Sequence, residues 1–320
     1  MRENTLVTLV LIAYNQEQFI KEAVQSALSQ TYSPLEIILS DDCSPDRTYE
    51  IMKVLASGYN GPHKIILNRN AHNLGLAGNI NHAFELSAGQ FIVIQAGDDI
   101  SVPERVEKLV QRWQDPTAHV DLVCSYFEEI DINGKPTGYI ERNVVFVPDK
   151  NKQISKWRCG ATGACAAYSR ILYEKYGPLD MRVFSEDWVY SFRAWLESGI
   201  AVVEEPLVKH RTHSIALSVI HQNINAVQDE PLRWRHRRKN AENSLGIAEE
   251  WLRAWKISGN KDDIRINTDL HHLVKIRHMQ LLAHDSTRAA AFKLAILLLF
   301  NRGGLVNTAR ILVRHVLRCG

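Results

Sequence analysis

The stretch that decides the fold is TLVTLVLIAYNQEQFIKEAVQSALSQTYSPLEIILSDD, residues 5–42. Residues 5–12 form a continuous apolar and β-branched run, which is typical of a strand buried on both faces. Residues 17–30 then place apolar side chains at helical spacing, and residues 35–40 form a second buried run. Because a strand, a helix and a further strand follow one another here, the stretch predicts parallel pairing of the two strands.

The same alternation continues as far as residue 125. We expect further strands at 64–67, 91–95 and 120–125. We expect helices between them at 46–55, 76–87 and 103–113. Asp46 is the expected N-cap of the helix that ends at residue 55. The alternation predicts an α/β fold with a mostly parallel sheet covered by helices on both faces. In such folds ligands bind at the carboxyl ends of the strands, where the strand order reverses.

Composition excludes several classes of protein. The chain has 320 residues, of which 45% are hydrophobic and 23% charged, which excludes disorder over most of its length and a small disulfide-stapled scaffold. The five cysteines are scattered and form no C-x-x-C pair, so a zinc ribbon or a thioredoxin-like site is not expected. Reduced thiols suit a cytosolic location. No signal peptide is recognised, and the longest apolar run, 289–300, is too short to span a bilayer.

Charge is distributed unevenly along the chain. Residues 1–220 contain 21 Lys and Arg against 27 Asp and Glu, whereas residues 221–320 contain 17 against 9. The basic last third indicates an anionic partner such as a membrane surface, or alternatively a helical face in solvent. Nucleic-acid binding is not expected, because no recognised nucleic-acid-binding motif accompanies the charge.

Nucleotide-binding motifs of other enzyme classes are absent. The chain has no G-x-G-x-x-G after the first strand and no G-x-x-x-x-G-K-[ST], which disfavours a dinucleotide-dependent dehydrogenase and a P-loop enzyme. It also lacks G-x-S-x-G, which disfavours an α/β-hydrolase.

Carboxylate pairs instead follow two of the predicted strands. Asp41-Asp42 and Asp98-Asp99 both stand at expected strand ends, and two such pairs at one sheet edge repel each other unless a cation compensates them. A divalent cation with oxygen ligands is the natural compensator. Either pair alone is also explained as a turn or a helix cap.

The motifs occur in a recognisable order: Ala13-Tyr14-Asn15, Gln30-Thr31-Tyr32, Asp41-Asp42-Cys43-Ser44-Pro45-Asp46, Asn73-Leu74-Gly75 through Asn81, Asp98-Asp99, Ser185-Glu186-Asp187-Trp188 and Arg211-x-His213. This ordered set resembles that of the family-two inverting glycosyltransferases, which have the GT-A fold, over roughly residues 5–218. The resemblance implies a nucleotide-sugar-dependent catalytic domain at 1–220, with a basic, mostly helical region at 221–320. It implies a role in bacterial surface polysaccharide biosynthesis.

Site residues follow from the same resemblance. Asp99 and Asp98 would hold Mg²⁺ or Mn²⁺ against the donor diphosphate, and Asp187, assisted by Glu186, would deprotonate an acceptor hydroxyl of a saccharide or lipid-linked saccharide. The residues expected to contact the donor are Ala13, Tyr14, Asn15, Asp42, Asn81, Asp98 and His213.

A purely structural role is the alternative for several of these residues. Tyr14 is alternatively an aromatic at the edge of the core, and Glu186-Asp187 alternatively a pair that complements a helix dipole. His210 and His213, on either side of Arg211, could ligate a metal or alternatively be exposed loop residues. A non-catalytic nucleotide-sugar-binding or scaffold protein on the same fold is the alternative function.

The sequence also departs from the family pattern. Ile12-Ala13 stands where members often have Pro-Thr or Pro-Ser, Ala96-Gly97 replaces the common Asp-Ala, and Ile80 replaces an Arg. The first change removes a hydroxyl contact to the nucleotide, and the second leaves metal ligation to Asp98 and Asp99.

The apolar run 292–300 and the stripe of Arg310, Arg314 and Arg318 are typical of an interfacial helix with a basic face. We therefore expect a cytoplasmic protein, with peripheral contact at the inner face of the cytoplasmic membrane. The alternative is a helical subdomain packed on the catalytic core.

Overall fold

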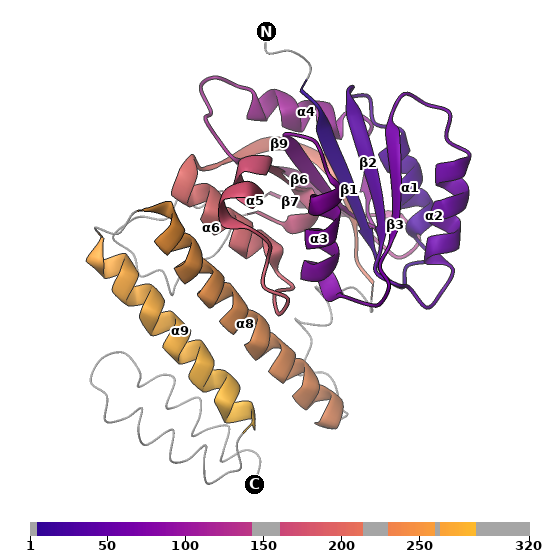
Figure 1. Cartoon of the computed structure of the whole chain (residues 1–320). Coiled ribbons are helices and arrows are strands. Elements are labelled where there is room, and N and C mark those ends of the chain that lie inside the picture. The colour runs from indigo at the N-terminus through magenta and orange to yellow at the C-terminus, as the bar shows by residue number, and fades with distance from the viewer. Residues whose placement is uncertain (1–4, 143–160, 214–229, 260–262, 286–320) are drawn as a thin grey trace. The chain divides into compact units, whose positions relative to one another are not determined.

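The protein is described from a computed structural model (Figure 1), which covers residues 5–142, 161–213, 230–259 and 263–285. It divides into two compact units. The first comprises Met1–Asp149 and Arg158–Ala216, and the second comprises Lys150–Trp157 and Leu217–Gly320. The apolar run 292–300 and the stripe of Arg310, Arg314 and Arg318 lie outside the described residues.

The first unit is built on one mixed sheet with the strand order β3-β2-β1-β4-β8-β6-β9-β5, and β7 pairs with β6. The strands are β1 (Val7–Ala13), β2 (Leu35–Asp41), β3 (Lys64–Arg69), β4 (Phe91–Ala96), β5 (Ile100–Ser101), β6 (Leu122–Ile130), β7 (Pro136–Glu141), β8 (Ala166–Ser169) and β9 (Ile200–Arg211). The pairs β1–β2, β2–β3, β1–β4 and β6–β9 are parallel. The expected mostly parallel α/β sheet is therefore confirmed.

Helices connect and cover these strands. They are α1 (Ile20–Leu28), α2 (Thr48–Ser57), α3 (Gly75–Leu86), α4 (Arg105–Trp113), α5 (Arg170–Tyr176) and α6 (Glu186–Glu197), with a short 3₁₀ turn at Gly163–Cys165. In Figure 1 the strands β1 to β3 and their helices form the indigo and purple part of the chain.

The core sits between the strands and the helices. On one face of β1 the side chains of Val7, Leu9 and Leu11 are fully buried in a cluster that includes apolar residues of α1 and α4. This cluster also contains Ile37 of β2 and Val93 of β4. Since every residue of β1 and β2 is buried, the continuous apolar runs of the sequence are explained by helices on both faces of the sheet.

The order of the strands reverses at β1, which lies between β2 and β4. Ala13 is in register with Asp41, and Ile12 with Ala96. The loops that follow β1, β2 and β4 therefore start from the same edge of the sheet, as we expected for a ligand site.

Two details differ from the sequence expectations. The N-cap of α2 is Arg47 rather than Asp46, whose carboxylate reaches past it to the backbone N–H of Thr48 at 3.0 Å. In addition, β8 is inserted between β4 and β6 and runs antiparallel to both. Local periodicity did not indicate β8, because it has four residues and its pairing partners are distant in sequence.

The second unit contains two helices in its described part, α8 (Glu230–Ser258) and α9 (Ile264–Asp285), which pack against each other. Trp251 and Trp255 of α8 and Leu270 of α9 are buried. The expected helical character of the C-terminal region is confirmed for these residues. Among the described helices, none is both long and apolar enough to cross a membrane.

Candidate functional site

Asp98 and Asp99 lie directly after β4 and are held by the end of β9. Asp99 is completely buried, and its Oδ1 accepts the backbone N–H of Arg211 at 2.8 Å while its Oδ2 lies 3.1 Å from Nδ1 of His210. Oδ2 of Asp98 lies 2.9 Å from Nε2 of His213. The segment that we singled out as Arg-x-His thus contacts both carboxylates.

Arg211 is the centre of this arrangement. Its guanidinium is buried, donates from Nε to the Asp98 carbonyl at 3.0 Å, and pairs with Glu22 of α1 at 2.6 Å. It also donates to the carbonyls of Asp131 and Ile132 in the turn between β6 and β7. A single side chain therefore ties together four segments that are distant in sequence.

Burial and charge shift the pKa values of this cluster. Burial raises the pKa of Asp99, and the neighbouring His210 opposes that rise. Burial would lower the pKa of His210, but the carboxylates of Asp99, Asp98 and Glu129 outweigh it and raise this pKa to about 9. Near neutral pH, His210 is thus a cation that offsets part of the negative charge of the two aspartates.

The cluster fits a hard divalent cation. Carboxylate oxygens are ligands that Mg²⁺ and Mn²⁺ favour, and Oδ1 of Asp98 accepts no hydrogen bond within the described part of the chain. No group of three or more His, Cys, Asp or Glu side chains in that part is arranged to enclose a metal. The oxygens of a bound diphosphate are ligands of the same kind and could share such a cation with Asp98 and Asp99.

The loop after β1 presents an exposed aromatic ring. Tyr14 is 47% exposed, which agrees with a position at the edge of the core and leaves its ring accessible to a ligand. Ala13 ends β1, and Asn15 adopts a left-handed backbone conformation with φ 55°. Within this loop, Ala13, Tyr14 and Asn15 occupy the same edge as Asp98 and Asp99, because β1 and β4 are neighbours.

Asp42 is buried at the end of β2 and orients the start of α3. Its Oδ1 accepts N–H bonds from Leu74 and Asn70, both at 2.8 Å, and its Oδ2 accepts the backbone N–H of Gly75 at 2.9 Å. The amides at a helix start favour a carboxylate, so these three hydrogen bonds fix the orientation of the Asp42 side chain. Oδ2 retains acceptor capacity for a further N–H group.

Asn81 lies in a different setting from the other candidates. It is buried in α3, and its side-chain amide exchanges two hydrogen bonds with the backbone of Leu179, at 2.9 and 2.8 Å. This exchange fixes the segment that leads to α6. A contact between Asn81 and the donor stays a prediction.

The second carboxylate pair opens α6. Glu186 and Asp187 occupy its first turn, and burial raises the pKa of both carboxyls, with Asp187 raising that of Glu186 further. Backbone N–H bonds from Trp188 and Gly163 oppose the rise for Asp187. The pair is packed against Gly163, where an added Cβ would lie 2.0 Å from Oε1 of Glu186. Glu186 is buried and Asp187 is partly buried, and a raised pKa suits a carboxylate that acts as a general base.

Arg105 links the segment around Gly163 to the sheet. This fully buried side chain donates to the carbonyls of Ile94 in β4 and Ala164, at 2.8 and 2.9 Å, and to Ser101 Oγ. Sequence analysis missed it, together with Glu22. The sequence did contain a sign that Arg105 is buried, because Arg105 shares a helical face with the buried Leu109 and interrupts an apolar stripe.

Comparisons with known proteins agree with this architecture. The family model described as Glycosyl transferase family 2 matches residues 8–177. Putative glycosyltransferase EpsE of Bacillus subtilis is 39% identical over 137 residues, which cover 42% of this chain and 48% of that protein. The chain thus matches only about half the length of this relative.

A second relative has a more specific name. The UDP-Glc:alpha-D-GlcNAc-diphosphoundecaprenol beta-1,3-glucosyltransferase WfaP of Escherichia coli is 34% identical over 105 residues, 33% of this chain and 40% of that protein. Among solved structures, the mannosyltransferase PcManGT from Pyrobaculum calidifontis, in complex with GDP-Man and Mn²⁺, aligns with a TM-score of 0.54 at 17% identity, over 99% of this chain and 81% of that one.

The matching family model covers more than half of the chain, and the fold is that of GT-A transferases. The chain therefore belongs to glycosyl transferase family 2.

Proposed function

We propose that the protein is an inverting, metal-dependent glycosyltransferase that moves a sugar from a nucleoside-diphosphate sugar to a hydroxyl of a saccharide or lipid-linked acceptor. The observation that carries this proposal is the pair of carboxylate sites: Asp98-Asp99 at the sheet edge where the strand order reverses, and Glu186-Asp187 at the start of α6, where Glu186 is buried and Asp187 is partly buried. The first suits a cation and diphosphate, and the second suits a base.

The donor is expected at the ends of β1, β2 and β4. Tyr14 offers its exposed ring to a nucleobase, and Asp42 offers an oriented carboxylate oxygen to a base N–H. Asp98 and Asp99 would hold Mg²⁺ or Mn²⁺, which would neutralise the charge that develops on the leaving diphosphate. The Mn²⁺ and GDP-Man of the similar mannosyltransferase structure support this choice of ligands.

Asp187 acts as the base in this proposal. It takes the proton of the acceptor hydroxyl while that oxygen attacks the anomeric carbon, and the bond from this carbon to the diphosphate oxygen breaks with its electrons leaving on the diphosphate. Attack opposite the leaving group inverts the anomeric configuration. Burial, and then the neighbouring Asp187, raise the pKa of Glu186 to about 8, which would let this carboxyl donate a hydrogen bond that orients Asp187 or the acceptor.

The acceptor class is proposed from the relatives. WfaP is named as a transferase to a diphosphoundecaprenol-linked sugar, which supports a lipid-linked saccharide acceptor and a role in surface polysaccharide biosynthesis. The basic residues 221–320 suit a cytoplasmic enzyme that contacts the anionic inner face of the membrane peripherally. We further propose that residues 1–220 act as the catalytic domain.

A non-catalytic nucleotide-sugar-binding protein is the alternative. The raised pKa of Asp187 favours an enzyme, because a binding protein has no need for such a carboxylate in its acceptor region.

The proposal is tested with a panel of UDP- and GDP-sugars, Mn²⁺ and short saccharide or polyprenyl-diphosphate-sugar acceptors. Release of nucleoside diphosphate with a product of inverted anomeric configuration, read by NMR, supports it. Donor binding without transfer to any acceptor would favour the binding protein, and retention of configuration would exclude the single displacement.

A further inference from the structure

Two loops of the donor side are joined by a set of cross-loop hydrogen bonds. The first loop is residues 14–19, after β1, and the second loop is residues 42–47, after β2. The backbone N–H groups of three consecutive residues of the first loop donate to the side chains of Ser44, Asp46 and Thr48. Ser44 and Asp46 belong to the second loop, and Thr48 begins α2. The bonds are Asn15 N–H to Ser44 Oγ at 2.9 Å, Gln16 N–H to Thr48 Oγ1 at 2.8 Å and Glu17 N–H to Asp46 Oδ2 at 2.9 Å.

The second loop returns one bond and closes the set. The backbone N–H of Arg47 donates to Oε2 of Glu17 at 2.9 Å, and Oδ1 of Asp46 accepts the N–H of Thr48 at 3.0 Å. Ser44 and Thr48 are buried, so an amide that lost either hydroxyl would have no water to replace it. We call these cross-loop bonds the loop clamp.

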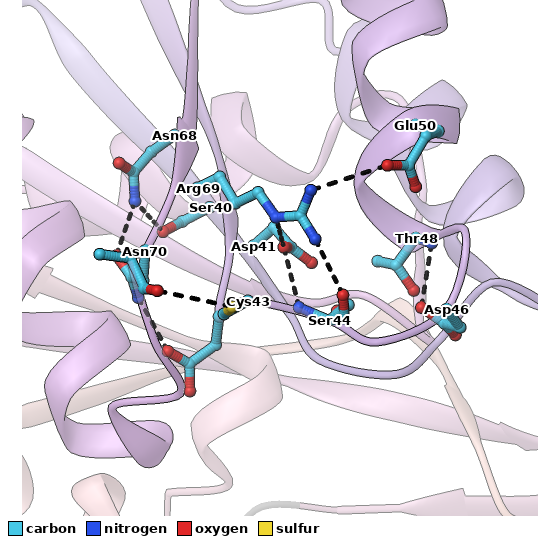
Figure 2. Close-up of polar contacts among 12 residues, drawn as sticks. Ser40, Asp41, Cys43, Ser44, Asp46, Thr48, Glu50, Asn68, Arg69 and Asn70 are labelled. Carbon is cyan, nitrogen blue, oxygen red and sulfur yellow. Dashed lines mark hydrogen bonds and ion pairs between the residues drawn. The ribbon is translucent and has the colours of Figure 1, made fainter.

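Arg69 of β3 braces the second loop from its other side (Figure 2). It donates to the Ser44 carbonyl at 3.0 Å and lies 3.5 Å from Oδ2 of Asp41, which also accepts the Ser44 N–H. Figure 2 shows this guanidinium reaching Glu50 as well. Ser44 is therefore fixed through its backbone while its hydroxyl holds the first loop.

Both loops turn through a left-handed residue directly after a proposed donor contact. Asn15, with φ 55°, follows Tyr14, and Cys43, with φ 58°, follows Asp42. Residues other than glycine adopt this conformation uncommonly, Asn more readily than Cys, and contacts with the surroundings help to hold it. The clamp supplies that hold, since it begins at Asn15 itself and at Ser44, the neighbour of Cys43.

We propose that Ser44, Asp46 and Thr48 are positioning residues for donor binding: the loop clamp holds Tyr14 and Asp42 in the relative placement that receives the nucleobase. This inference rests on the proposed function, in which these two residues contact the donor. When the clamp is weakened, donor binding must order the first loop, and affinity falls by the cost of that ordering. Turnover at saturating donor changes little, because the clamp touches no reacting atom.

Thr48 gives the sharpest test. Thr48→Val keeps the shape of the side chain and removes the hydroxyl, whereas Thr48→Ser keeps the hydroxyl. Asp46→Asn is the second probe, because an amide has one acceptor oxygen for two N–H groups. Its matched control is Asp115→Asn, since Asp115 accepts the N–H of Thr117 at 2.9 Å in an equivalent turn. That turn follows α4 and lies near Thr5, before the start of β1.

The measurements are the dissociation constants of UDP and GDP with Mg²⁺ by calorimetry, KM and kcat for the donor, and hydrogen exchange of the first loop in the full-length chain. We expect about tenfold weaker binding and a matching rise of KM for Thr48→Val and Asp46→Asn, with near wild-type kcat. Thr48→Ser and Asp115→Asn should stay within about twofold of wild type, because they keep the clamp.

Wild-type affinity in Thr48→Val and Asp46→Asn, with faster exchange of the first loop, would overturn the positioning role and leave the proposed function intact. An equal loss in Asp115→Asn would overturn it too, because it would show a general loss of stability. If the wild-type chain bound neither nucleotide, the proposed function would fail, and the positioning role with it.

Discussion

Asp98 and Asp99 are neighbours in sequence but differ in what surrounds them. Asp99 is fully buried and has both oxygens engaged by β9, whereas the Asp98 side chain is 13% exposed and uses one oxygen for His213. Asp99 therefore holds the cluster together, and Asp98 is the more available ligand. Removing the Asp99 carboxylate would take away the acceptor of the buried Arg211 backbone N–H and the partner of His210, so variants of Asp98 separate metal binding from folding more cleanly.

At the residue scale, Asp187→Asn should abolish transfer and leave donor binding unchanged. The amide has nearly the same shape but does not accept the acceptor proton at neutral pH, and loss of a general base costs about 10²–10⁴-fold in rate. Transfer is measured by nucleoside diphosphate release and donor affinity by calorimetry. Near wild-type turnover in Asp187→Asn would assign the base to another residue.

The pH dependence of transfer follows from the same residue. The base works when ionised, and burial raises the pKa of Asp187 above the usual value of about 3.9. Activity should thus be full at the alkaline side of this raised pKa and fall as the pH drops through it. The acidic limb of kcat should lie clearly above pH 4, with circular dichroism confirming that the fold persists. A limb at the usual pKa of an aspartate in solvent would contradict a base whose pKa is raised.

At the scale of elements, the turn at Gly163–Cys165 sets the position of the carboxylate pair on α6. A Cβ at Gly163 would lie 2.0 Å from Oε1 of Glu186, and the Gly163 N–H bonds to Asp187. Gly163→Ala should therefore displace both carboxylates and reduce kcat by about tenfold or more, since a shift on the order of 1 Å in a positioned group has such effects.

The control for this change is Gly58→Ala, where the added Cβ meets its nearest neighbour, the Val54 carbonyl, at an ordinary 3.5 Å. Transfer rates and melting temperatures of both variants are compared. Equal activity of the two variants would mean that the turn does not position the pair.

The sequence predicts elements that are set by contacts between neighbouring residues better than elements that depend on partners distant in the chain. Buried β1 and β2 were evident from continuous apolar runs, and α1 and α4 from helical periodicity, because these signals are local. Strand β8, the ties made by Arg211 and the bond from Arg105 to Ala164 depend on partners more than 40 residues away, which periodicity does not encode. The sequence predicted that Asp98 and Asp99 lie at the end of strand β4. It did not predict the contacts with β9 and His213 that hold them.

At the scale of the whole molecule, the basic last third should give reversible, salt-sensitive binding to anionic membranes. Residues 286–320 contain six Lys and Arg and no Asp or Glu, and each such residue near an anionic leaflet contributes on the order of 1 kcal/mol. The full chain and a chain ending at Asp285 are compared by co-sedimentation with anionic and neutral vesicles. Equal partitioning of the two chains would remove the support for membrane contact through this segment.

The central claim is that Asp98 and Asp99 bind a nucleoside diphosphate through a divalent cation. It is tested most directly by titrating UDP and GDP into the full-length protein with Mn²⁺ and with EDTA, for wild type, Asp98→Asn and the Asp115→Asn control. We predict that Mn²⁺ tightens binding of one nucleotide by at least about tenfold in wild type and in the control, and that Asp98→Asn loses this gain. Equal affinity with Mn²⁺ and with EDTA in the wild-type protein would contradict the account.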